Sequence, residues 1–419
     1  MQQTRHFFHA TWPLLCFIRG LVVVMLMAVT LVMFNRMGMS NTAAAIVTSL
    51  FLLPMALRPF LSIVVESAGK PKWWMVIALA VFAGALFMAA GHLDAFPDEW
   101  QMWLAMAVAA LAGAFFDAAA NESRQEALLQ KNYGMLKIMV PCKLMAVVIV
   151  MGVVLLLAGN MEVMSRDITE SWALALKVAA FVVVVMMLLL WATVPNSSGK
   201  ATLGEAWQQR RGEMAEWWKA DRLRWLFVCF VILFPLHEFF LWKGTLLFLV
   251  DKGSIGGLSF SPQEVGFAFC TVATLMAIAG YVMGVNVIRK YSLKKWWWVM
   301  ALAFTIPDAV YVYLAYAMPD ELWLVTLCLS VEQWCCGFGI AAYIIYIMYG
   351  NHKKCSVTHL DICWSLVVIS MVLSGCVMGV MKDYLGYRRF FIVVMVLAIL
   401  ALAIAGWMAK KAKTNTTDD

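Results

Sequence analysis

The chain has 419 residues, of which 63% are hydrophobic and only 14% are charged. A soluble domain carries about 25% charged residues, so this composition excludes an ordinary soluble protein. Apolar runs of roughly 20 residues, long enough to cross a bilayer as helices, recur along the whole length. Backbone groups in lipid must be paired within the protein, and these runs are too long and continuous for barrel strands. We therefore expect an all-α integral membrane protein.

Twelve transmembrane helices are expected, six on each side of a long polar connection. The expected spans are residues 12–34, 42–65, 73–92, 99–121, 135–158, 169–193, 225–250, 264–288, 296–318, 322–349, 357–381 and 389–409. The first is too long for a signal-peptide core and is expected to be retained. The chain then divides into a bundle at 1–193, a cytoplasmic linker at 194–224, and a second bundle with a short tail at 225–419. Residues 204–224 could form an amphipathic helix on the inner membrane face.

Basic residues collect in alternate loops and set the expected orientation. With the N-terminus inside, the inner loops are basic and the outer loops mostly acidic, as the positive-inside rule expects. The net charge of +7 therefore does not indicate nucleic-acid binding. Two expected outer loops disagree, one with Arg36 and one with Lys382, Arg388 and Arg389. Both termini are expected in the cytoplasm, and the chain in the inner membrane.

A sequence repeat relates the two expected bundles. The first copy, Lys72-Trp73-Trp74-Met75-Val76-Ile77-Ala78-Leu79-Ala80, recurs as Lys295-Trp296-Trp297-Trp298-Val299-Met300-Ala301-Leu302-Ala303. Both copies stand where a short basic loop enters a long apolar helix. Two parallel six-helix pseudo-repeats are the major facilitator arrangement. The loop with Gly280, Gly284, Arg289 and Lys290 resembles the signature loop of that superfamily.

Three further stretches together resemble the muropeptide permease family (AmpG-like transporters). They are Leu53-Pro54-x-x-Leu57-Arg58 with Glu66 eight residues on, Phe116-Asp117-Ala118-Ala119-Ala120-Asn121, and Glu332-Gln333-x-x-Cys336-Gly337-x-Gly339. The resemblance implies that the substrate is a muropeptide, an anhydro-sugar with attached peptide, moved from periplasm to cytoplasm. Two departures stand out. Asn121 replaces an expected second Asp, and Asp361 stands where an uncharged residue is expected.

Charged residues at membrane depth are costly and mark candidate functional sites. In the major facilitator arrangement helices 1, 4, 7 and 10 line the cavity, and each carries one here: Arg19, Asp117, Glu238 and Glu332. Glu238 and Glu332 are the candidates for proton coupling, and His237 could share the proton. The structural alternative is a permanent ion pair of Glu238 with Lys243 or His237.

The remaining candidates divide between a gate and the substrate cavity. Arg58 and Asp117 lie at similar depth near the inner face, where a pair that forms and breaks would act as a gate. Glu66 and Asn121 are placed with them. Arg19 and Lys143 are candidate partners for an anionic ligand. The cavity set is completed by Lys243, Gln333 and Trp334, and the Trp334 ring either stacks on a sugar or simply packs.

These observations favour a secondary active transporter that works by alternating access. Its expected partners are a small-molecule substrate, protons and the lipid bilayer, with no nucleic acid, and the chain is expected to be a monomer. A siderophore or another small metabolite is the alternative substrate. A membrane-embedded transferase and a transporter-derived sensor also stay open. The sequence has no Walker, HExxH or GxSxG motif, and we expect no cofactor, no metal and no enzymatic activity.

Overall fold

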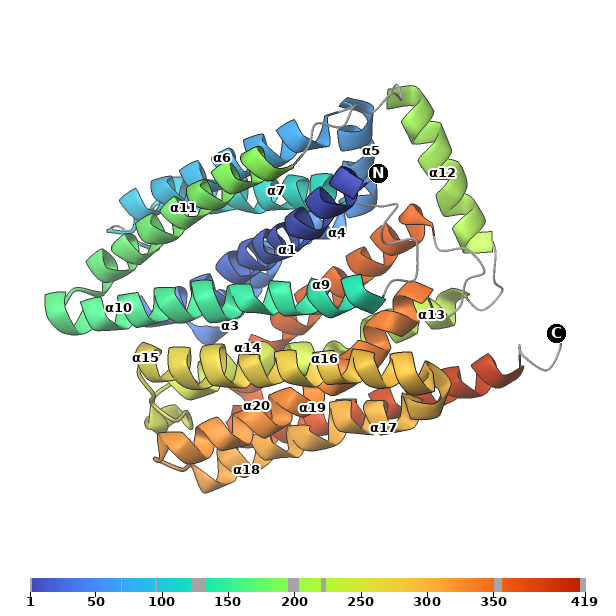
Figure 1. Ribbon diagram of the computed structural model, residues 1–419. Helices are drawn as coiled ribbons and strands as arrows, with labels where there is room; N and C mark the ends of the chain where they lie inside the picture. The colour runs from blue at the N-terminus through green and yellow to red at the C-terminus, as the bar shows by residue number, and fades with distance from the viewer. Residues whose placement is uncertain are drawn as a thin grey trace.

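The computed structural model describes residues 2–68, 70–94, 96–122, 133–194, 203–219, 224–349 and 356–414, and its regular elements in these ranges are all helical (Figure 1). The elements of the first half, in chain order, are α1 (Gln2–Val24), η1 (Met25–Val29), α2 (Thr30–Arg36), α3 (Asn41–Leu50), α4 (Leu53–Ala56), α5 (Arg58–Ala68), α6 (Pro71–Gly91), α7 (Trp100–Glu122), α9 (Tyr133–Ala146), η2 (Val147–Met151), α10 (Gly152–Ser165) and α11 (Ile168–Thr193). The helix α12 (Leu203–Lys219) follows and corresponds to the expected linker helix.

The second half has the same character. Its elements are α13 (Arg224–Leu233), α14 (Leu236–Val250), η3 (Gly253–Ile255), α15 (Pro262–Val265), η4 (Gly266–Ala273), α16 (Thr274–Tyr291), α17 (Leu293–Thr305), η5 (Ile306–Asp308), α18 (Ala309–Ala317), α19 (Leu322–Tyr349) and α20 (Val357–Thr414). The repeated Lys-Trp-Trp segments lie at the start of α6 and of α17, so the two copies occupy matching positions at helix beginnings.

Ten helices of the described chain are long and apolar enough to cross a membrane, and a bent pair, Asn41–Ala56 with Arg58–Ser67, brings the number to eleven. The protein is therefore a multi-pass membrane protein. Each expected span overlaps one of these helices within a few residues. The last two expected spans both fall on α20, whose 58 residues are broken at Gly386, where φ is 68°.

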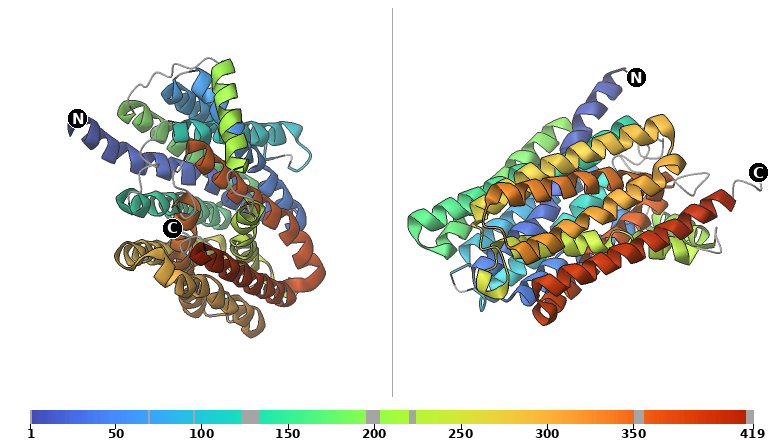
Figure 2. Two further views of the ribbon diagram at one scale, coloured as in Figure 1. Left: turned by 90° about the vertical axis from the view of Figure 1, so that its right-hand side faces the viewer. Right: turned by 90° about the horizontal axis from the view of Figure 1, so that it is seen from below.

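The helices of the two halves lie on opposite sides of the molecule in Figure 1, and α12 stands at one end. The start of α1 and the end of α20 lie at this same end, which we call the linker end. The turn between α10 and α11 and the segment around α15 lie at the other, which we call the distal end. Figure 2 shows α12 lying across the linker end, and it contacts α5 of the first half and α20 of the second.

The two halves approach most closely where α3 packs on the first arm of α20. A Cβ atom at Gly379 would lie 2.5 Å from the Cα atom of Thr42, and one at Gly375 would lie 2.0 Å from the Ser49 hydroxyl. Small residues four positions apart face one way and let two helix backbones come together. This contact fixes how the halves meet toward the distal end.

Three spans are interrupted beside charged residues. The second bends by 46° at Leu57, directly before Arg58. Pro235 separates α13 from α14, and Glu238 lies in the first turn after that break. Pro307 lies in the 3-10 turn η5 together with Asp308. A proline removes a helical hydrogen bond, and irregular backbone at membrane depth is tolerated where it is enclosed by protein or lines a cavity.

Candidate functional site

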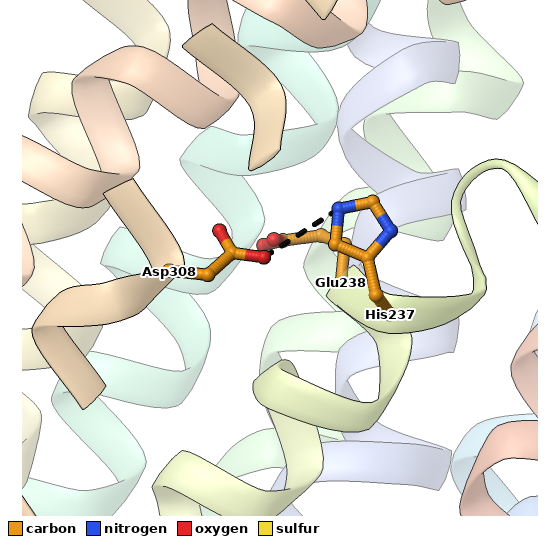
Figure 3. Close-up of side chains that lie close together, drawn as sticks. All are labelled: His237, Glu238 and Asp308. Atoms are coloured by element: carbon orange, nitrogen blue, oxygen red, sulfur yellow. Dashed lines mark ion pairs between the residues drawn. The ribbon is translucent and has the colours of Figure 1, made fainter. Parts of the chain in front are cut away.

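Three buried carboxylates gather inside the second half. Glu238 comes from α14, Asp308 from η5 and Glu332 from α19, and none of these residues is more than 5% exposed. One ligand atom each of His237, Glu238 and Asp308 lies within 4.8 Å of the others, and the same holds for Glu238, Glu332 and Cys336. Figure 3 shows Glu238 and Asp308 turned toward each other, with the His237 ring beside them. We call Glu238, Asp308 and Glu332 the acidic cluster.

The hydrogen bonds of the acidic cluster leave part of it unpaired. Tyr311 donates its hydroxyl to Glu332 Oε2 at 2.6 Å, and Gln333 donates its amide to the same oxygen at 3.0 Å. His237 Nε2 lies 3.5 Å from Asp308 Oδ2. Within the described residues, Glu238 Oε2 and Glu332 Oε1 have no hydrogen-bond partner.

No Lys or Arg side chain forms an ion pair with the acidic cluster in the part of the chain that the structure describes. A buried carboxylate with neither a counter-charge nor hydrogen bonds is costly. The cluster therefore requires protons or another cation. By atom spacing alone, the two groups of His, Cys and carboxylate ligands described above could hold a metal ion. Glu332 Oε2 already accepts two hydrogen bonds, which a metal ion bound to that oxygen would have to displace. Protons on the carboxylates leave these two bonds in place.

Lys243 does not pair with Glu238, so the part of the structural alternative that named Lys243 is wrong, whereas His237 does lie beside Glu238. The Lys243 ammonium group donates to Ala45 O at 3.1 Å, to Thr48 Oγ1 at 3.0 Å and to Ser49 Oγ at 2.6 Å. All three acceptors belong to α3. Because Lys243 is on α14, this fully buried cation joins the two halves.

A second charged group lies inside the first half. Arg19 Nε is 2.7 Å from Asp117 Oδ1, and Arg58 Nη2 donates to Asp117 Oδ2. The expected contact of Arg58 with Asp117 is thus present, and it joins α5 to α7 within one half. Lys143 stands 4.4 Å above the ring of Trp364, on α20. The side chain of Asn121, the other gate candidate on α7, lies outside the described residues.

Glu66 takes part in a network at the linker end that spans both halves. Its Oε2 atom lies 3.1 Å from Arg210 Nε on α12. Arg210 Nη1 reaches Thr358 Oγ1 at 3.2 Å and Asp361 Oδ2 at 3.7 Å, both on α20. Ser62 of α5 also donates to Asp361, at 3.2 Å. Sequence reasoning missed Arg210, although it flagged Asp361 as out of place.

A matching network closes the distal end. Asp251 Oδ2 accepts from Asn41 at 2.5 Å and from Tyr387 at 2.6 Å, and it lies 3.2 Å from Lys382 Nζ. Asn35 donates to the other oxygen, Oδ1, at 3.0 Å. Two of these partners come from the first half and two from the second. Nothing in the sequence had singled out Asp251.

Most of the cations that departed from the expected charge pattern of the outer loops bind partners at the distal end. Arg36 Nη2 lies 2.5 Å from Glu162 Oε2, and Lys382 pairs with Asp251. Arg388 donates to the Ala315 carbonyl at 3.1 Å. Arg36, Lys382 and Arg388 thus have local partners, whereas Arg389 is exposed and forms no ion pair within the described residues.

The Trp334 ring packs against a neighbouring aromatic ring of its own helix. It stacks on Phe338, one helical turn away, with 6.0 Å between centroids and 5° between ring planes. Packing accounts for this contact, whereas the neighbouring Gln333 is directly bonded to Glu332.

No protein-family model matches the chain. The anhydromuropeptide permease of Escherichia coli K12 is 24% identical over 180 residues, which span 43% of this chain and 35% of the permease. A solved structure of a proton-dependent oligopeptide transporter superposes with a TM-score of 0.71 at 12% identity, over 98% of this chain and 100% of that one. A nucleoside transporter, NupG, superposes with a TM-score of 0.64 at 16% identity, over 96% and 99%.

The chain has the major facilitator fold. The sequence match to the permease covers only about a third of that protein, so it supplies no activity by itself. The relatives with a stated role and these structural neighbours are transporters and not enzymes. Within that fold, the acidic cluster, the Arg19–Asp117–Arg58 group and the two end networks are groups of buried charged residues.

Proposed function

We propose that the protein is a proton-coupled secondary active transporter that imports its solute by alternating access. The observation that carries this proposal is the acidic cluster, three buried carboxylates without a Lys or Arg partner among the described residues. Such a group takes up and releases protons when access to it alternates between the two sides of a membrane. The resemblance of the fold to proton-dependent transporters supports the same reading.

The proposed architecture has twelve spans in two parallel pseudo-repeats, 1–193 and 225–419, joined by the 194–224 linker. Counting the bent second span as one and the two arms of α20 separately gives that number. The linker end faces the cytoplasm in this proposal, and both termini with it, in the inner membrane. A monomer suffices, since the acidic cluster and both end networks are built within one chain.

Glu332 and Glu238 are proposed as the proton carriers, and His237 as the group that shares their proton. The His237 Nε2 atom contacts the Phe304 carbonyl at 3.3 Å and lies 3.5 Å from Asp308 Oδ2. The distal network around Asp251 and the linker-end network of Glu66 are proposed as the two gates. Arg58 and Asp117 connect helices within the first half and set the position of α5 at the inner gate.

The proposed substrate is an anhydro-muropeptide, an amphipathic and anionic solute. The match to the permease of Escherichia coli and the cationic Arg19 and Lys143 support this choice. A siderophore or another small metabolite is the second candidate, since the fold by itself is compatible with many solutes.

The test is uptake of a labelled anhydro-disaccharide peptide into liposomes that hold the purified protein. A gradient of one pH unit supplies about 1.4 kcal/mol per proton, enough for about tenfold accumulation if one proton accompanies each solute. We expect Glu332→Gln to lose accumulation and to keep exchange of labelled for unlabelled solute. The matched control is Glu321→Gln, an exposed acid just before α19, which should accumulate solute like the wild type.

Full accumulation by Glu332→Gln would remove the residue from the coupling mechanism. Failure of well-folded wild-type protein to bind or move the peptide would remove the muropeptide, and siderophores would be tried next.

A further inference from the structure

The Arg58 side chain has unused hydrogen-bonding capacity deep inside the molecule. Arg58 is 6% exposed, and its Nη2 atom is occupied by Asp117. Its Nε and Nη1 atoms have no hydrogen-bond partner within the described ranges. A guanidinium group presents its donors as a planar fork, which fits the two oxygens of a carboxylate or phosphate. Leaving two such donors unpaired in a buried site is costly, so they indicate a ligand.

The position of Arg58 places this fork at the interface between the halves. It is the first residue of α5, directly after the bend at Leu57. Ser62 lies one helical turn further on the same face, and it touches Asp361 of α20 in the second half. The start of a helix carries a positive partial charge, and interrupted spans of transporters direct such ends at anionic solute groups.

Two more cations surround Arg58. Arg19 lies on the other side of the shared Asp117 carboxylate. Lys143 is close enough to both arginines for direct electrostatic interaction. Its backbone is pressed against α1, since a Cβ atom at Gly20 would lie 2.3 Å from the Lys143 carbonyl oxygen. The three cations come from α5, α1 and α9.

Within the described residues, the cations of this region outnumber the acids that contact them. Asp117 neutralises one of the three cations. Asp361, the other acid within electrostatic reach, is shared with a fourth cation, Arg210. Glu66 also pairs with Arg210, so within the described residues four cations lie near three acids at membrane depth, where an unbalanced charge is costly.

We propose that Arg58 Nε and Nη1 form an oxyanion subsite, with Arg19 and Lys143 supplying charge, that binds a carboxylate or phosphate group of the transported solute. This inference rests on the proposed function and goes beyond it, because it assigns the chemical class of the recognised group. A lipid headgroup has the same chemistry, but the buried position of the fork favours a soluble solute.

The test uses the full chain in phosphatidylcholine nanodiscs, and the probe is inorganic phosphate against chloride at equal ionic strength. We expect phosphate to raise the thermal unfolding midpoint of the wild type. Arg58→Gln should weaken the apparent affinity for phosphate about tenfold or more, the effect of losing charged hydrogen bonds. Lys177→Gln, which removes an exposed cation on α11, should bind phosphate like the wild type.

Arg58→Lys serves as a second variant because it keeps the positive charge while removing the fork, and we expect it to weaken phosphate binding as well. A wild type without a phosphate effect, or variants at Arg58 that keep the full effect, would overturn the subsite. So would a phosphate effect that disappears when phosphatidylglycerol is included in the nanodiscs, since a headgroup would then be the anion.

The phosphate measurement does not depend on which solute is transported. Loss of the phosphate effect in Arg58→Gln, together with no binding of the anhydro-disaccharide peptide by the wild type, would support the subsite and remove the muropeptide. Peptide uptake that is unchanged in Arg58→Gln, together with an unchanged phosphate effect, would overturn the subsite and leave the transport proposal standing.

Discussion

Replacing Asp251 by asparagine should loosen the distal end of the molecule. Asp251 is 5% exposed, and its carboxylate is bonded from the first half by Asn35 at 3.0 Å and by Asn41 at 2.5 Å. Lys382 and Tyr387 hold it from the second half. The substitution keeps the size of the side chain and removes the negative charge that all four donors share.

The size of the effect follows from the two bonds that cross between the halves. A hydrogen bond to a charged group contributes about 1.5–3 kcal/mol, against about 1 kcal/mol for a neutral one. Weakening both cross-half bonds, with part of the loss recovered by the new amide, costs the closed distal end about 2 kcal/mol. Since about 1.4 kcal/mol is a factor of ten, the ratio of closed to open molecules should fall about 30-fold.

Distances between spin labels measure this ratio. Met164 at the end of α10 is 78% exposed and Tyr384 on α20 is 85% exposed, so cysteines at these positions in a cysteine-free background carry labels on the two halves. Double electron–electron resonance should show a longer distance gaining population in Asp251→Asn. The control is Asp320→Asn, an exposed acid between α18 and α19.

Distance distributions for Asp251→Asn that superimpose on those of the wild type would refute this reasoning. The same refutation would follow if Asp320→Asn produced an equal shift, because the change would then reflect lost surface charge and not the bonds between the halves.

Two further predictions concern contacts between the halves. Gly379→Val should push the new side chain against Thr42 on α3 and lower the thermal unfolding midpoint, at an overpacking cost of about 1–3 kcal/mol. The control is Gly84→Val, whose side chain meets open space. Equal midpoints for the two variants would contradict this prediction. Arg210→Gln should release α12 from both halves, so that chymotrypsin cleaves at its tryptophans faster than in the control Arg211→Gln, whose side chain is exposed. Equal cleavage rates would show that Arg210 does not hold the helix.

Much of the fold was accessible from sequence because a lipid environment leaves few choices. An apolar run of about 20 residues has to be a helix, and all the expected spans overlap described helices. The same reasoning found charged residues at depth, and it is why Glu238, Glu332 and the Arg58–Asp117 contact were singled out. The free-energy cost of placing a charged side chain inside a membrane helix can be recognised from the apolar residues around it in the sequence.

The partners of these residues were less accessible. Arg210 lies in a polar linker, where a cation is ordinary and does not indicate a special role. Its acidic partners, Glu66 and Asp361, are at least 144 positions away along the chain. Asp251 stands at the end of a span, where an acid is ordinary. Lys243 was expected beside Glu238, one and a half turns away on α14, but three oxygens of α3 satisfy it instead. Such pairings depend on tertiary packing.

The contact of α3 with α20 limits how the two halves can move. Gly375 and Gly379 present bare backbone to Ser49 and Thr42 of α3, so the two helices lie close together there. The Lys243 ammonium group beside Gly375 is bonded to three oxygens of α3, so a large displacement of the two helices at this point would break those bonds. The linker-end network and the Asp251 network lie on either side of this contact, and each would have to break for its end to open. In the proposed transport cycle, the contact at these two glycines is therefore the place where the halves stay together while one end opens.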